Sequence, residues 1–167
     1  EISTPEELAW AVFKYSKENT KEDVCFRLKN DIDLSAHPWL TFGWESTQKT
    51  RLFINPFRFI FDGNGHTIKK LYNLDLTGHE HPAQDGEGQG KESFVGLFPW
   101  VQGKALIKNL TRDSVYVFGP QGGALIGRAE YLDRPIKEQV TKEPSSYSYR
   151  FLENIVVSNA IVAGYGV

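Results

Sequence analysis

Cysteine and methionine are almost missing from this 167-residue chain: it has one Cys, at position 25, and no Met. A single cysteine excludes an intramolecular disulfide and any zinc site built from several cysteines. Stability must therefore come from packing and from backbone hydrogen bonds. Because Cys25 lies between Val24 and Phe26, we expect it to be a small core residue rather than a reactive thiol.

Long apolar runs and an excess of one charge are also missing. No stretch reaches the roughly 20 apolar residues that cross a bilayer as a helix, so no membrane insertion is expected. The 19 Lys and Arg residues nearly balance the 21 Asp and Glu residues, giving a net charge of -2. This balance provides no general attraction to nucleic acid, and no nucleic-acid partner is expected. No pattern in the chain requires a cofactor.

The chain is predicted to begin with a short helix within residues 1–20 and to continue as strands. Thr4 can cap the helix, Pro5 suits its first position, and Glu7 completes a capping box. Short segments rich in β-branched and aromatic residues follow, separated by Asn, Asp, Gly and Pro. The predicted strands are Val24–Leu28, Ile32–Leu34, Leu52–Phe61, Thr67–Leu76, Phe94–Phe98, Leu106–Leu110, Val115–Phe118, Ala124–Ile126 and Leu152–Val162.

An internal repeat organises these strands. Residues 107–110 (Ile-Lys-Asn-Leu) align with residues 152–155 (Leu-Glu-Asn-Ile), and residues 68–71 (Ile-Lys-Lys-Leu) are aligned as an earlier copy. Units too small to bury their own apolar face must stack on a neighbour. The repeat therefore predicts an all-β fold, a right-handed parallel β-helix of the pectin-lyase-like solenoid type, closed by the N-terminal helix. Asn109 and Asn154 recur at one phase and are predicted to form a structural hydrogen-bonded ladder.

We expect one domain over residues 1–167. The polar segments 77–93 and 129–150 interrupt the repeat and are predicted to be loops at one edge of the solenoid. The repeat pattern reaches the last residues without a terminating feature, from which we expect further turns beyond residue 167.

Four segments resemble a known family of repeats. They are Ile2–Leu8, Leu28–Leu34 with its Asn-Asp-Ile-Asp-Leu, Phe61–Ile68 with its Phe-Asp-Gly-Asn-Gly-His-Thr-Ile, and Gly123–Gly127. Together they resemble the GLUG-repeat β-helices of bacterial surface proteins, adhesins and the non-catalytic N-terminal regions of immunoglobulin A peptidases. The resemblance covers most of the chain apart from the two insertions, which are longer than is usual for such a repeat. It implies an extracellular or bacterial cell-surface location and a modular role in a longer protein.

The expected function is that of a non-enzymatic module in adhesion, in ligand binding or as a spacer. Its expected partners are a host glycan or glycoprotein and other domains of the same polypeptide. The alternative is a polysaccharide lyase or glycoside hydrolase, which needs paired carboxylates or a base beside a cation. Asp31, Asp33 and Asp62 are regularly placed, but their turn positions favour structural hydrogen bonds. A phage tail-fibre module is a third hypothesis and predicts a stable homotrimer.

Two sets of side chains are candidate ligand contacts. The aromatic candidates for stacking on sugar rings are Trp39, Trp44, Trp100, Tyr147 and Tyr149, for which packing into gaps is the competing role. The candidate metal ligands are His79, His81 and Asp85, which lie in a glycine-containing insertion that otherwise is expected to be a solvated loop. No catalytic residue is assigned.

Overall fold

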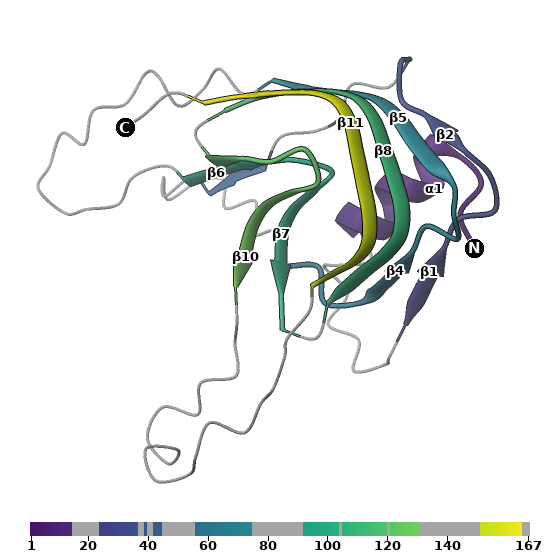
Figure 1. Cartoon of the computed structure of the whole chain (residues 1–167). Helices are drawn as coiled ribbons and strands as arrows, with labels where there is room; N and C mark the ends of the chain where they lie inside the picture. The colour runs from purple at the N-terminus through teal and green to yellow at the C-terminus, as the bar shows by residue number, and fades with distance from the viewer. Residues whose placement is uncertain are drawn as a thin grey trace, which may run out of the picture.

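The structure is a computed structural model that describes residues 1–14, 24–36, 39, 42–44, 56–74, 92–103, 105–119, 121–130 and 151–164. It is rich in strands and has one short helical segment at the N-terminus (Figure 1). The elements are α1 (Pro5–Ala9), the π-helical turn η1 (Trp10–Lys14), β1 (Cys25–Arg27), β2 (Ile32–Asp33), β3 (Phe42–Trp44), β4 (Ile60–Asp62), β5 (Thr67–Leu74), β6 (Glu92–Val95), β7 (Phe98–Gln102), β8 (Leu106–Phe118), β9 (Gln121–Gly122), β10 (Ile126–Glu130) and β11 (Leu152–Ala163).

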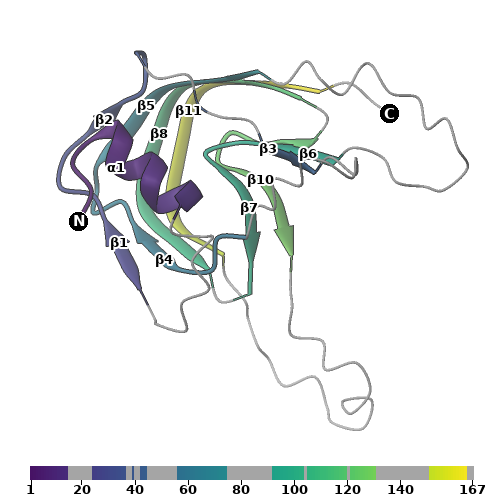
Figure 2. The ribbon, with the colours of Figure 1, turned by 180° about the vertical axis from the view of Figure 1, so that it is seen from behind.

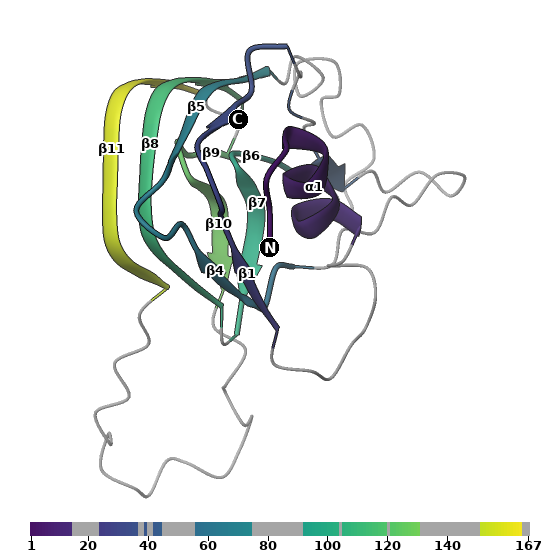
Figure 3. The same ribbon diagram turned by 90° about the vertical axis from the view of Figure 1, so that its right-hand side faces the viewer.

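Helix α1 begins as the sequence predicts. The backbone N–H of Glu7 donates to the Thr4 hydroxyl at 3.2 Å, and the Thr4 N–H donates back to the Glu7 carboxylate at 3.2 Å. These reciprocal bonds satisfy two amides that the first turn leaves without helical partners. Leu8 and Ala11 are buried, and the helix lies at the end of the main sheet that β1 and β2 form (Figures 2 and 3). None of the helices in the described ranges has the length and apolar character of a membrane-spanning segment.

The main sheet has six parallel strands and is built around β8. Strands β4 and β5 pair with successive parts of β8, from Ile60 opposite Leu106 and from Thr67 opposite Thr111. On its other side β8 pairs with β11 along nearly its whole length. The shorter strands β1 and β2 add to β4 and β5. Strand β11 therefore lies at one edge of the sheet and α1 at the opposite end (Figure 3).

Two smaller sheets face the main sheet. Strands β7 and β10 form a parallel pair, and β6 pairs in parallel with β9 and antiparallel with β3. The core between the sheets is rich in phenylalanine: the ring centroids of Phe57 and Phe98 lie 4.9 Å apart, and those of Phe61 and Phe98 lie 5.1 Å apart. Such tilted and edge-on contacts are the usual packing of buried aromatic rings.

The prediction of a right-handed parallel β-helix is corrected by this topology. The described part of the chain is mostly strands with a short N-terminal helix, and its main sheet is parallel, but the strands do not follow one another as uniform stacked turns. The main sheet branches at β8, and the pair formed by β3 and β6 is antiparallel. A repeat of short units predicts parallel pairing, and parallel pairing alone does not require a solenoid.

One repeat alignment is also wrong. The structure pairs Leu152 with Ile107, as predicted, but it places Phe61 opposite Ile107 and Ile68 opposite Arg112. Residues 68–71 therefore match the second half of β8 rather than its start. The two strands predicted at 106–110 and 115–118 are one strand of 13 residues.

Cys25 is exposed, which corrects the expectation that it is a core residue. In β1 the burial alternates, so that Phe26 is buried while Cys25 and Arg27 face outward. The alternation of side chains along a strand decides the position, and an apolar neighbourhood in the sequence does not reveal it.

Candidate functional site

The most unusual surface of the molecule is the outer edge of β11. Five side chains of β8 point into the core and are almost completely buried; they are Ile107, Leu110, Arg112, Val115 and Val117. Their partners in β11 occupy the same inward row; they are Leu152, Ile155, Val157, Ala160 and Val162. Three members of this second row, Leu152, Val157 and Val162, are each 45% exposed. In the part of the chain that the structure describes, β11 pairs only with β8, so a row of core-type side chains is left uncovered on one side.

A ladder of amides fixes the first bend of this sheet. The side-chain amide of Asn154 donates to Oδ1 of Asn109 at 3.0 Å, and the Asn109 amide donates to Oδ1 of Asp62 at 3.1 Å. Asn109 and Asn154 both adopt left-handed backbone conformations, with φ of 53° and 52°. Asn tolerates this conformation better than most residues, which explains why an amide recurs here inside apolar segments.

Asp62 shows how the ladder holds a charge. Burial opposes ionisation of this carboxyl group, but the bonds from the Asn64 backbone amide and the Asn109 side chain outweigh it and hold its pKa below the usual value. The sequence predicted that Asp62 accepts local backbone N–H groups, and the 2.9 Å bond from Asn64 confirms this. The carboxylate therefore stabilises the turn as a hydrogen-bond acceptor, and its lowered pKa makes it unsuited to donate a proton.

A second row of left-handed residues crosses the sheet five positions further on. Lys70, Ser114 and Asn159 align across β5, β8 and β11, with φ of 57°, 55° and 49°. The Asn159 amide and the Ser158 hydroxyl each donate to Asp113 at 2.7 Å. These side-chain bonds lower the pKa of Asp113. Strands β8 and β11 are thus bent twice, at matched positions, and both bends are visible in Figure 1.

Apolar and aromatic side chains also line the outward face of the same strands. The rings of Tyr72 and Tyr116 are stacked, with centroids 5.4 Å apart and planes 10° apart. Ile161 follows Tyr116 in the register and is more than half exposed. The edge strand therefore presents apolar groups on both of its faces. Exposed apolar residues on an ordinary surface are scattered singly and do not form such a continuous strip.

A buried cation lies directly beneath this edge. The Arg112 side chain is fully buried and donates one bond, from Nη1 to the Ile68 carbonyl at 2.7 Å. Among the described residues, its Nε and Nη2 atoms have no hydrogen-bond partner. Burial lowers the pKa of Arg112 to about 9. An unpaired buried guanidinium is costly to the fold.

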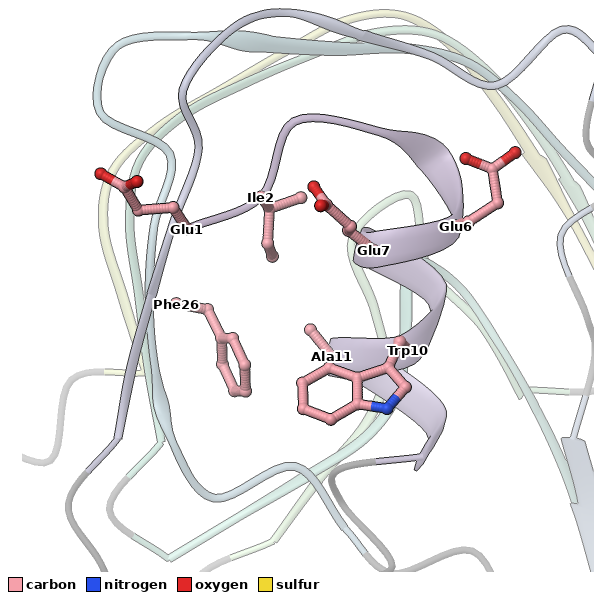
Figure 4. Close-up of a pocket in the computed structure, with 7 residues that line it drawn as sticks. All are labelled: Glu1, Ile2, Glu6, Glu7, Trp10, Ala11 and Phe26. Atoms are coloured by element: carbon pink, nitrogen blue, oxygen red, sulfur yellow. The ribbon is translucent and has the colours of Figure 1, made fainter.

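A pocket of about 440 Å³ lies at the opposite end of the molecule (Figure 4). It is lined by Glu1, Ile2, Glu6, Glu7, Trp10, Ala11 and Phe26. Trp10 and Phe26 meet edge to face, with centroids 6.5 Å apart. The carboxylates of Glu1 and Glu7 are already engaged: that of Glu1 forms an ion pair with Lys29, and that of Glu7 accepts bonds from the Ser3 and Thr4 amides at the helix cap. The pocket suits an apolar group, and two of the carboxylates that line it are committed to structural contacts.

Of the predicted ligand residues, Trp39, Trp44 and Trp100 lie in the described part of the chain. Trp39 is buried, and its ring N–H donates to the Leu97 carbonyl at 3.1 Å, so it packs in the core. Trp100 is half-buried beside Phe94, and Trp44 lies in β3, where only its backbone is described. The remaining predicted contacts, Tyr147, Tyr149, His79, His81 and Asp85, lie outside the described residues, as does most of the two insertions. Within the described ranges, no three His, Cys, Asp or Glu side chains gather as metal ligands would.

Sequence reasoning missed the stacked tyrosines and the uncovered edge. The correct register of β5 against β8 would have placed Tyr72 beside Tyr116, so the signal was present but was read in the wrong alignment. No protein-family model, curated protein or solved structure matches the chain.

Proposed function

We propose that this chain is a binding module of a bacterial surface or secreted protein, and that it holds another polypeptide at the outer edge of β11. The observation that carries the proposal is the contrast between two strands in one register. The inward row is buried in β8, whereas four of its five members in β11 are exposed. A sheet edge that offers both backbone hydrogen-bonding groups and apolar side chains is a common site of strand addition.

The location rests on the resemblance of four sequence segments to GLUG-repeat surface proteins. A modular binding role agrees with that resemblance and with the expected functions of adhesion, ligand binding or spacing. The lyase or hydrolase alternative draws no support from the three regularly placed acids. Asp31 accepts a bond from the Thr67 amide, Asp33 pairs with Lys70, and Asp62 belongs to the amide ladder.

The test is selection of peptides from a displayed random library on the whole chain. Selected peptides are then measured against two variants, Val157→Lys and Val156→Lys. Both valines are exposed, but Val157 belongs to the inward row of β11 while Val156 pairs with the half-buried Thr111. An added strand would bury the inward row of β11. A lysine in that row therefore places a charge where apolar side chains would pack.

We expect selected peptides to lose binding to Val157→Lys and to keep it with Val156→Lys. A library that yields no binders, or only binders that tolerate Val157→Lys, overturns the proposal. Circular dichroism of both variants serves as the folding control.

A further inference from the structure

We infer that the polypeptide held at β11 is an extended strand that runs parallel to β11 and carries, five residues apart, two residues able to adopt the left-handed conformation. This inference rests on the proposed function and specifies its partner. The geometry of β11 excludes a second copy of this chain as the source of this strand.

The outer edge of β11 continues the interface between β8 and β11. In that interface ten residue pairs are in parallel register, and both left-handed rows continue across it. Strand β11 carries bends at Asn154 and Asn159, which are the positions opposite Asn109 and Ser114 of β8. The outer edge of β11 therefore follows the same doubly bent path as the edge of β8 that β11 itself covers. A strand without bends at these positions would diverge from β11 and could hydrogen-bond to its edge over only a few residues.

Two β11 strands from two copies cannot pair antiparallel with both their bends and their faces matched. To place bend against bend, Asn154 of one copy must face Asn159 of the other, and Val156 then faces Val157. Residues directly opposite in an antiparallel pair share one face of the sheet. Val157 belongs to the inward row, however, and Val156 does not. No antiparallel register matches the bends and the faces together.

Copies of this chain also cannot stack head to tail. The other end of the main sheet is already covered, because Ile2 pairs with Leu28 and exchanges backbone bonds with Arg27 and Lys29 at 2.8 and 2.9 Å. Helix α1 lies across the same end (Figures 2 and 3). A second copy therefore has no equivalent open edge to offer to β11.

The side chains of β11 define the sequence that fits. Apolar residues are required opposite Leu152, Val157 and Val162, which continue the inward row. The residue opposite Asn154 is best an asparagine, because Oδ1 of Asn154 accepts no bond in the described part of the chain while its amide is spent on Asn109. Another Asn, Gly or Ser suits the position opposite Asn159.

The experiment uses a peptide that copies residues 151–163, extended by lysines for solubility, and measures its binding to the whole chain by fluorescence anisotropy. The matched control peptide carries N154V and N159V, because β-branched residues strongly resist the left-handed conformation. We expect the control to bind roughly tenfold more weakly or worse, from a cost of about 1–2 kcal/mol at each left-handed position. Equal binding of the two peptides, or no binding of the first, overturns the inference.

Orientation is tested with a nitroxide at the N-terminal end of the bound peptide. A parallel strand broadens the amide signals of residues near Leu152, and an antiparallel strand broadens those near Val162. The second pattern overturns the inference. Library peptides that bind at the edge without the five-residue spacing also overturn it while leaving the proposed function intact, so the two failures are distinguishable.

Discussion

Replacing the buried Arg112 with methionine should make the protein more stable. The guanidinium is fully buried, and desolvation lowers its pKa from 12.5 to about 9. At about 1.4 kcal/mol per pKa unit, the charged form costs the folded state at most about 5 kcal/mol at neutral pH. Losing the bond from Nη1 to the Ile68 carbonyl offsets about 1.5–3 kcal/mol of this. We expect Arg112→Met to raise the free energy of unfolding by about 2 kcal/mol, which lies within the range seen when buried charges are replaced by apolar residues.

The assay is urea unfolding at pH 7, followed by tryptophan fluorescence. The control is Arg27→Met, which removes an exposed guanidinium bonded to Asn64 and should change the stability by no more than about 0.5 kcal/mol. The pH dependence has a definite sign. Because burial lowers the folded pKa, the wild type gains stability as the pH rises above about 9, and the advantage of the variant shrinks there. An unfolding free energy of Arg112→Met equal to or below that of the wild type refutes the reasoning.

Two further perturbations test the turn between β4 and β5. Gly63→Ala should cost about 2 kcal/mol, because a Cβ at this position would lie 2.5 Å from the Asn109 carbonyl oxygen, whereas Gly65→Ala meets no neighbour and should cost about 1 kcal/mol for its positive φ; equal shifts in melting temperature would contradict the close approach. The lowered pKa of Asp62 means that its carboxylate stabilises the fold above the usual pKa of 3.8 and that this stability is lost as the pH falls below it. Asp62→Asn should therefore lose less stability than the wild type between about pH 5 and pH 3, and parallel acid-unfolding curves would exclude the proposed role.

Local features of the fold could be predicted from the sequence. The capping box of Thr4 and Glu7 depends on four consecutive residues, and the structure contains both of its bonds. The pairing of Leu152 with Ile107 could be predicted because both strands carry the same pattern over their whole length.

The remaining features depend on register, which the sequence left ambiguous. Residues 68–71 resemble residues 107–110 in composition, but β4 and β5 are two strands joined by a turn at Asn64 and Gly65, and each pairs with a different part of β8. The predicted alignment was shifted by about half of β8. It therefore did not reveal that Arg112 points inward or that Tyr72 contacts Tyr116. The global arrangement failed for a related reason, since parallel pairing between neighbours does not determine how the sheets close around the core.

The two bends of β11 have a consequence for solubility. A long strand with apolar residues on both faces and an open edge is the kind of segment that seeds fibrils, because flat strands of identical chains stack without limit in a cross-β array. Strand β11 is not flat: the left-handed residues at 154 and 159 break its pleat into three short straight pieces. Two folded copies cannot pair their β11 strands antiparallel, bend against bend, without placing inward residues against outward ones. The same bends that favour a parallel visiting strand thus oppose antiparallel pairing between two folded copies.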